Sequence, residues 1–118
     1  MTRINCGIPP KELNSKHLIA EHREIKRIPN LIKKGKYCLK GKPDKFTLGT
    51  GHVKFFYDKL KYLKNRYIEL YDECISRGFN VSNYADAWDG LPNELVNDYV
   101  PTSDDVIIVK ERINSKLK

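Results

Sequence analysis

Residues 52–78, HVKFFYDKLKYLKNRYIELYDECISRG, decide how this chain folds, because they contain its most regular hydrophobic pattern. Seven apolar or aromatic residues recur there at alternating spacings of three and four: Val53, Phe56, Leu60, Leu63, Tyr67, Leu70 and Cys74. This spacing places all seven on one face of an α-helix of about six turns. Gly78 can take the left-handed conformation that ends a helix, so the pattern predicts one central helix up to that glycine. We expect its aromatic side chains to pack in the core rather than to stack on bases.

A second amphipathic stretch precedes the central helix. Pro9 and Pro10 can open a helix, and apolar residues then recur at near-helical spacing up to Ile32. Pro29 lies inside this pattern, where it removes a backbone donor and crowds the preceding turn. We therefore expect a kink or break over 27–29 and a helical continuation to about residue 34.

The remaining segments predict one more helix and long connections. Ser103 or Asp104 can cap a third helix, whose apolar positions are Val106, Val109, Ile113 and Leu117. Residues 79–102 are rich in Asn, Asp, Gly and Pro, which favours an irregular connection with one short helix around 92–97. Strand signals are weak. The sequence predicts an all-α fold, with three main helices and long irregular connections in a single domain over 1–118.

Charge is distributed unevenly along the chain. The net charge is +7, but residues 1–66 carry 17 Lys or Arg and 5 Asp or Glu, whereas residues 67–118 carry 5 and 10. Such segregation attracts a polyanion, which makes nucleic acid the leading candidate partner. Residues 33–45 form a lysine-rich loop that either contacts phosphates or is simply solvated. A generally basic surface without a specific partner remains the alternative.

Several classes of protein are disfavoured by what the sequence lacks. No apolar run reaches the roughly 18–20 residues of a membrane span, and the N-terminus lacks the apolar segment of a signal peptide, so we expect a cytoplasmic protein without membrane contact. Cys6, Cys38 and Cys74 are widely spaced and form no Cys-x-x-Cys pair. We therefore expect neither a metal site nor a disulfide, no cofactor, and a buried Cys74 beside two incidental free thiols.

The start of the chain offers an unusual nucleophile. A small second residue such as Thr2 normally permits removal of the initiator Met1, which would expose the α-amine of Thr2. The pKa of an α-amine is about 7.7–8.0, so part of it is neutral near pH 7. Glu24 lies between Arg23 and Arg27 on the first predicted helix. The charge pattern alone favours a different interpretation, in which these groups form surface ion pairs between neighbouring turns.

Seven separated blocks of sequence favour a catalytic role for these groups over surface ion pairing. They are Met1-Thr2-Arg3-Ile4-Asn5, His17-Leu18-x-Ala20-Glu21-x-Arg23-Glu24-x-x-Arg27, Leu48-Gly49-x-Gly51-His52-Val53-x-Phe55-Phe56-Tyr57-Asp58-Lys59-Leu60, Ile68-Glu69-Leu70, Glu73-Cys74, Arg77-Gly78-Phe79-Asn80 and Asp98-Tyr99-x-Pro101. Together they resemble the phage pyrimidine-dimer DNA glycosylase/AP lyase family, the endonuclease V of T-even phages. The resemblance covers nearly the whole chain.

The resemblance implies a mechanism and a set of site residues. It implies that the amine of Thr2 attacks the anomeric carbon of a damaged nucleotide, displaces the base and forms an imine, and that Glu24 assists the β-elimination that nicks the strand. It also implies DNA contacts from basic side chains and one histidine: Arg3, His17, Arg23, Arg27, Arg112 and Lys116. The implied partner is a bent, damaged double-stranded DNA with one nucleotide turned out of the stack, bound by a monomer.

The chain also departs from the family pattern. The family continues past the third helix into a tail rich in Trp, Tyr and Lys, whereas this sequence ends at Lys118. His22 stands where the resemblance predicts Tyr, and Lys16 where it predicts Gln, and we expect both beside the reactive face. Imine-forming cleavage is therefore better supported than pyrimidine-dimer specificity. Action on abasic sites or another modified base, and non-catalytic DNA binding, are the alternatives.

Overall fold

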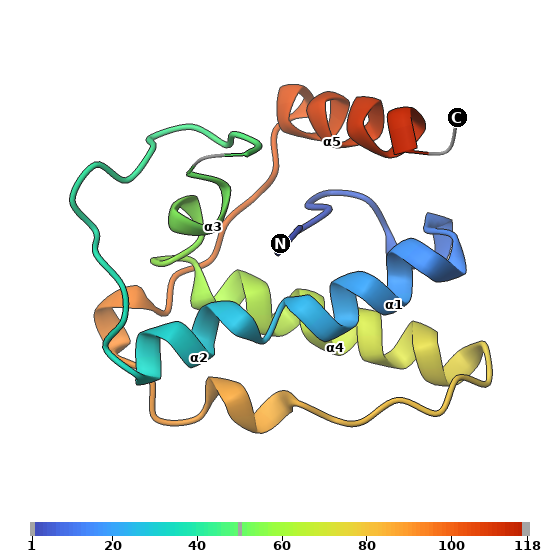
Figure 1. Ribbon diagram of the computed structural model, residues 1–118, viewed down its shortest axis with the longest axis horizontal. Helices are drawn as coiled ribbons and strands as arrows, with labels where there is room; N and C mark the ends of the chain where they lie inside the picture. The colour runs from blue at the N-terminus through green and yellow to red at the C-terminus, as the bar shows by residue number, and fades with distance from the viewer. Residues whose placement is uncertain (1, 50, 117–118) are drawn as a thin grey trace.

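Helix α4 (Leu60–Ser76) lies at the centre of the computed structural model, which describes residues 2–49 and 51–116, with side chains as far as Ser115. The other α-helices are α1 (Ser15–Glu24), α2 (Arg27–Lys33), α3 (His52–Phe55) and α5 (Ser103–Lys116). Short 3₁₀ turns are η1 (Pro10–Glu12), η2 (Ala85–Trp88) and η3 (Asn93–Leu95). No β-strand occurs within these residues, which confirms the predicted all-helical fold (Figure 1).

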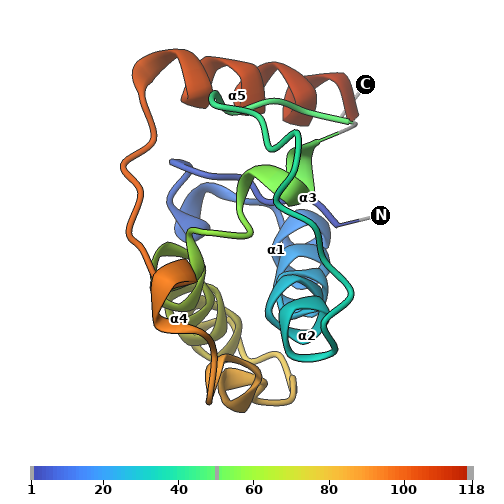
Figure 2. The ribbon, with the colours of Figure 1, turned by 90° about the vertical axis from the view of Figure 1, so that its left-hand side faces the viewer.

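The apolar face of α4 supports the rest of the fold. Its predicted core positions from Leu60 to Cys74 are buried, and so is Phe56. Helices α1 and α2 follow one another along one side of α4, and the segment that contains η2 packs against both α2 and α4 (Figure 2). The aromatic residues Phe56 and Tyr67 are 0% and 1% exposed. The aromatic stripe is therefore core packing, as predicted.

The end of α4 follows the prediction in detail. Gly78 has a φ of 82°, in the left-handed region. Its N–H donates to the carbonyl of Ile75 at 2.9 Å, and the N–H of Phe79 donates to the carbonyl of Cys74 at 3.0 Å. This pair of bonds is the Schellman arrangement, which satisfies carbonyls that the helix leaves free at its C-terminus.

The single helix predicted over 52–77 is wrong at one point, because the chain breaks it between α3 and α4. Residues 56–59 form tight turns, in which the N–H of Lys59 donates to the carbonyl of Phe56 at 3.0 Å. Side chains satisfy carbonyls at the break: Lys59 Nζ donates to Phe55 O at 3.1 Å, and Asn97 Nδ2 donates to Asp58 O at 2.9 Å. The break allows both Phe55 and Phe56 to be buried, at 2% and 0% exposure.

The first predicted helix is also divided. Pro10 starts only a 3₁₀ turn, and α1 begins after Asn14, whose side chain caps it by accepting the His17 N–H at 2.8 Å. The predicted break near Pro29 occurs slightly earlier, at residues 25–26, because Pro29 cannot donate to the carbonyl of Ile25 and is accommodated in the first turn of α2.

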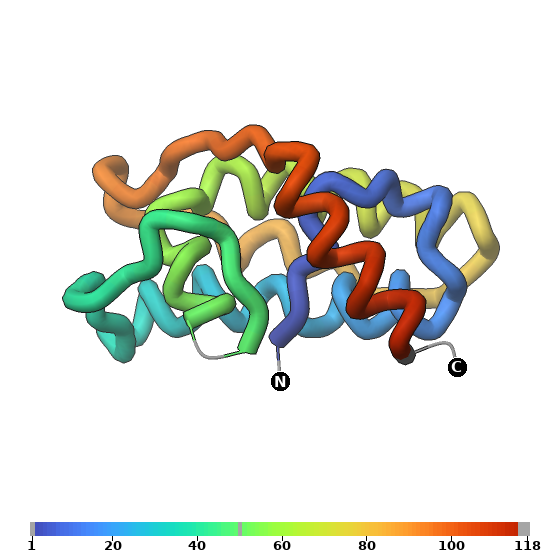
Figure 3. Tube along the Cα trace, turned by 90° about the horizontal axis from the view of Figure 1, so that it is seen from above, coloured from blue at the N-terminus to red at the C-terminus, as the bar shows by residue number. Residues whose placement is uncertain are grey.

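The C-terminal half has the predicted irregular connection. The short helix expected around 92–97 is the turn η3, and η2 was not predicted. Helix α5 is capped by Thr102 rather than by Ser103 or Asp104: Thr102 Oγ1 accepts the Asp105 N–H at 3.2 Å, and Asp105 Oδ2 accepts the Thr102 N–H at 3.1 Å. The predicted core position Leu117 lies outside the described residues. Helix α5 crosses over the N-terminal segment (Figure 3).

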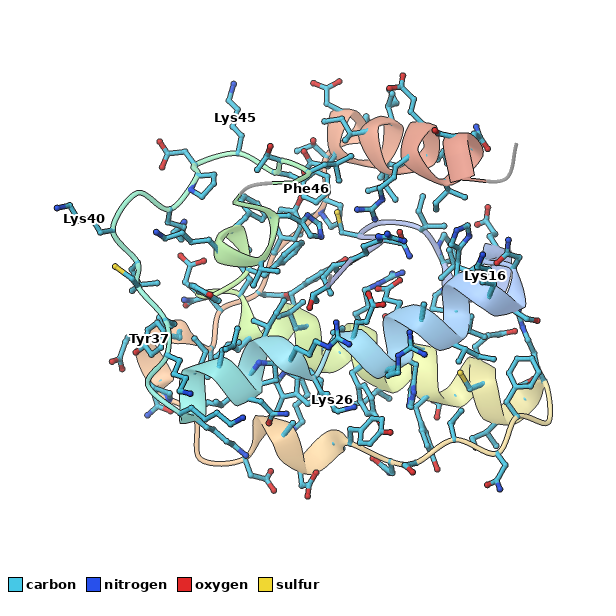
Figure 4. The ribbon with its side chains drawn as sticks, in the orientation of Figure 1. Lys16, Lys26, Tyr37, Lys40, Lys45 and Phe46 are labelled. Carbon is cyan, nitrogen blue, oxygen red and sulfur yellow. The ribbon has the colours of Figure 1, made fainter. Side chains whose placement is uncertain are left out.

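The lysine-rich loop runs along the outside of the molecule between α2 and α3. Lys40 and Lys45 point away from the body of the protein, whereas Phe46 lies beneath α5 and is 6% exposed (Figure 4). Tyr37 packs edge-on against Tyr57, with ring centroids 5.9 Å apart. The loop therefore presents lysines to solvent while aromatic residues anchor it.

Candidate active site

The N-terminal segment lies between α1 and α5, with polar side chains holding its backbone. The N–H of Arg3 donates to Glu24 Oε1 at 3.1 Å, and the N–H of Ile4 donates to His52 Nε2 at 2.9 Å. The side chain of Asn5 donates to Glu21 Oε1 at 2.8 Å and accepts from Arg112 at 2.6 Å. Residues from α1, α3 and α5 therefore fix the chain immediately after Thr2.

The carboxylate of Glu24 is the acidic group next to the chain start. Glu24 is the last residue of α1 and is 9% exposed. Its second oxygen lies 3.6 Å from Arg23 Nη2, which approaches from the solvent side with a side chain that is 58% exposed. A carboxylate held by a backbone N–H and a guanidinium is suited to stabilise developing positive charge.

A small cavity of about 20 Å³ lies on the α5 side of Glu24. Its lining brings together four predicted site residues from three parts of the chain, Arg3, His17, Glu24 and Arg112, with Asn5 and Glu21 beside them. Burial, and then the charges of Lys16, Arg112 and Arg3, lower the pKa of His17. Its Nδ1 is buried and has no hydrogen-bond partner among the residues that the structure describes. Burial also lowers the pKa of Arg112. This cavity therefore concentrates hydrogen-bond donors beside the carboxylates of Glu21 and Glu24.

A larger and more open cleft of about 310 Å³ lies beside Thr2. Thr2 lines it with Arg27, Asn30 and Lys34, together with two apolar side chains from α2 and α3. The predicted residues Arg23 and Arg27 are both exposed. Lys116 is the last residue of α5, and its side chain lies outside the described part of the chain. The structure thus gathers every predicted site residue around the N-terminal segment except Lys116, whose side-chain position is not described.

Sequence reasoning missed a buried ion pair beneath this site. Arg66 donates to both carboxylate oxygens of Glu21, and Arg66 Nη1 donates to the carbonyl of Ile8 at 2.9 Å. Arg66 is 5% exposed and Glu21 is 1% exposed. Burial alone would lower the pKa of Arg66, but the adjacent Glu21 raises it well above its usual range. One signal was present: each charge occupies a core position of its helix, since Arg66 lies between Leu63 and Leu70 and Glu21 between Leu18 and Ile25.

The expected place of His22 is wrong. His22 is 2% exposed and packs against Tyr67 and Tyr84, with ring centroids 5.2 and 5.3 Å apart. It therefore lies in the core between α1, α4 and η2 rather than beside the reactive face. Burial lowers its pKa, which keeps the ring neutral there. Lys16 is exposed near the start of α1 (Figure 4).

The cysteines and histidines offer no alternative centre. Cys6 and Cys74 are buried and Cys38 is exposed, and all three are free thiols. Cys6 is thus a core residue rather than an incidental thiol, and burial raises its pKa to about 12. Within residues 2–49 and 51–116, no cluster of three or more His, Cys, Asp or Glu could hold a metal ion. No helix over the same residues is long and apolar enough to span a bilayer.

Comparison with known families agrees with the geometry of the site. The model of the family described as pyrimidine dimer DNA glycosylase matches residues 1–86, which is most of the 118-residue chain. The matched range contains the N-terminal segment, α1, α2 and α4. It therefore includes Thr2, Glu24 and the basic residues beside them, while α5 lies beyond it. This chain belongs to the pyrimidine dimer DNA glycosylase family, whose members are DNA repair enzymes that act on DNA.

Proposed function

We propose that this protein is a DNA glycosylase with AP lyase activity, in which the amine of Thr2 is the nucleophile. The observation that carries the proposal is the hydrogen bond from the Arg3 N–H to Glu24 Oε1, at 3.1 Å. Covalent geometry limits the separation of the Thr2 and Arg3 nitrogens to about 4 Å, so the Thr2 nitrogen lies no more than about 7 Å from that oxygen. The carboxylate is thus within reach of a sugar attached to the amine.

The reaction proceeds in two stages. The lone pair of the neutral amine forms a bond to C1′ of the damaged nucleotide, and the bond from C1′ to the base breaks, with its electron pair leaving on the base. Opening of the sugar ring gives the protonated imine, while Glu24 stabilises the positive charge. The carboxylate then accepts the proton from C2′, and the C3′–O bond breaks, which releases the 3′ phosphate oxygen. Water finally hydrolyses the imine and restores the amine.

The basic residues around Thr2 support DNA binding in this proposal. Arg3, His17, Arg23, Arg27, Arg112 and Lys116 are proposed to contact the strand around the lesion. Arg23 and Arg27 are exposed on the side of α1 and α2 next to Glu24, and Lys34 extends the charge along the cleft. Contacts of this kind fix position without reading sequence, and they release counterions. Binding should therefore weaken steeply with salt.

Borohydride trapping tests the chemistry directly. A duplex containing a cyclobutane pyrimidine dimer and a duplex containing an abasic site should each give a covalent adduct at Thr2. An adduct with the abasic duplex alone would indicate that the protein acts on abasic sites or another modified base rather than on pyrimidine dimers. The absence of an adduct with both, from protein shown by mass spectrometry to begin at Thr2, would refute the enzymatic proposal. Protein that retains Met1 should give no adduct at Thr2 and should be inactive, because the Thr2 nitrogen is then an amide and cannot form an imine.

A matched pair of variants separates catalysis from binding. Glu24→Gln keeps an acceptor for the Arg3 N–H but removes the charge and the base, so nicking should fall by at least about 10²-fold while salt-dependent binding persists. Glu12→Gln changes an exposed glutamate on η1 and should behave as the wild type. Loss of DNA binding in Glu24→Gln would instead assign Glu24 a structural role.

A further inference from the structure

The chain start is held by more than Glu24. After Arg3, the next three backbone anchors are His52 on Ile4, the hydroxyl of Tyr62 on the Gly7 N–H at 3.3 Å, and Arg66 on the Ile8 carbonyl. Of these, the bond to His52 is nearest to Thr2. Of the three, only this bond has an acceptor, the imidazole of His52, that can gain a proton within the pH range in which enzymes work.

The contacts of His52 define its protonation state. Its Nε2 accepts the Ile4 N–H at 2.9 Å, so Nε2 carries no proton. Its Nδ1 lies 2.9 Å from the carbonyl of Thr47, which can only accept, so the proton is on Nδ1. The side chain is 3% exposed, and the rings of Phe46 and Phe56 pack edge-on against it, each with its centroid 5.4 Å away. The imidazole is therefore fixed in one orientation and one tautomer.

Protonation of His52 would break this arrangement. A proton on Nε2 would face the Ile4 N–H, so two donors would meet where one hydrogen bond now exists. Burial lowers the pKa of His52. The bond to the Thr47 carbonyl and the charge of Glu21 on α1 oppose this shift, and the charge of Arg112 on α5 adds to it. Release of the Ile4 backbone would free the residues on which the position of the Thr2 amine depends.

We propose that His52 is a positioning residue for the Thr2 amine, acting as a neutral imidazole that fixes the Ile4 backbone and so holds the amine beside Glu24. The inference rests on the proposed function, since it assumes that the Thr2 amine reacts. Acid then inactivates the enzyme by two separate protonations, one on the amine and one on His52. The first blocks the nucleophile, and the second misplaces it.

The pH dependence of single-turnover nicking, with an abasic duplex and saturating enzyme, tests this. As the pH is lowered, the nicking rate of the wild type should fall in two protonation steps, one for the amine and one for His52. The midpoint of the second step should match the pKa of His52 measured by NMR. In His52→Gln, the amide oxygen can accept the Ile4 N–H at every pH, so only the protonation of the amine should remain. His22→Tyr, which changes a buried histidine away from the N-terminal segment, should keep the wild-type profile. An unchanged second step in His52→Gln would overturn the proposal.

Two further measurements do not depend on activity, the tautomer of His52 and the exchange rate of the Ile4 amide, and the variant used for the second is also assayed for nicking. Long-range ¹H–¹⁵N NMR of the wild type should show the Nδ1–H tautomer of His52, and the Nε2–H tautomer would contradict the inference. His52→Phe removes the acceptor, so the Ile4 amide should exchange faster and nicking at pH 8 should fall about 10- to 100-fold, in kcat rather than KM. If Ile4 stays protected in this variant, His52 does not position the segment. If the wild type never nicks, the proposed function fails, and the NMR measurements still decide the role of His52 in holding Ile4.

Discussion

Removal of Arg66 should destabilise the protein more than removal of any surface charge. Arg66→Met keeps most of the side-chain volume on α4 but leaves the carboxylate of Glu21, which is 1% exposed, with the Asn5 amide as its remaining donor among these partners. It also removes the donor to the Ile8 carbonyl. Breaking a buried ion pair from one side costs about 3–5 kcal/mol, because an uncompensated charge stays in the interior.

The expected loss is large relative to the whole stability. Domains of this size unfold with free energies of about 5–15 kcal/mol, so Arg66→Met should remove at least about a fifth of that.

Urea denaturation at pH 7 measures this loss. Arg23→Met serves as the control, because Arg23 is 58% exposed and its pair with Glu24 spans 3.6 Å, so its removal should cost less than about 1 kcal/mol. The double variant Glu21→Met/Arg66→Met buries no charge and should be about 2 kcal/mol more stable than Arg66→Met alone. A loss below about 1 kcal/mol in Arg66→Met, or no recovery in the double variant, would refute this account of the pair.

Three further predictions concern other parts of the fold. Gly7→Ala should destabilise the protein by more than Gly78→Ala in urea denaturation: both have positive φ, but a Cβ at Gly7 would lie 2.5 Å from Val106 Cγ2, whereas the space at Gly78 is open. Thr102→Ala removes the cap of α5 and should cost about 1 kcal/mol in the same assay, which an unchanged midpoint would contradict. Native protein treated with iodoacetamide should be alkylated at exposed Cys38 and spared at buried Cys6, and mass spectrometry that finds Cys6 modified would disprove its burial.

The sequence predicted the helical fold well where hydrophobic spacing alone determines structure. The buried face of α4 follows directly from its spacing of three and four. The break between α3 and α4 did not follow, because Phe56 and Leu60 are four apart and keep the helical period across it. What breaks the helix is tertiary: Asn97, distant in sequence, bonds to the Asp58 carbonyl. A periodic pattern does not contain such a contact.

The sequence predicted which residues surround the candidate site, but it did not predict the buried residues that support them. Thr2, Glu24 and the arginines came from the resemblance, and the structure gathers them around the N-terminal segment. The shell that holds them, Glu21 with Arg66 and His52 with Ile4, joins residues 45 and 48 positions apart. In the sequence alone, Glu21, Arg66 and His52 look like ordinary surface or core residues, because their contacts form only when the helices pack together. The misplacement of His22 has the same cause, since the packing of α1 on α4 decides which of its faces is buried.

The order of the N-terminal segment supports the proposal that an amine on a chain end acts as a well-positioned nucleophile. Chain ends are usually poorly ordered, and fixing each residue costs about 1–2 kcal/mol of backbone entropy. Here Ile4, Cys6 and Ile8 lie along the N-terminal segment, which turns at residues 5–8, and they are 0%, 0% and 4% exposed. Each buried aliphatic side chain contributes about 1.5–3 kcal/mol, which offsets that entropy before any hydrogen bond is counted. The hydrogen bonds that Glu24 and His52 accept from the Arg3 and Ile4 N–H groups then fix the direction of the segment rather than its stability. The Thr2 amine lies only two residues from Ile4, the first buried anchor.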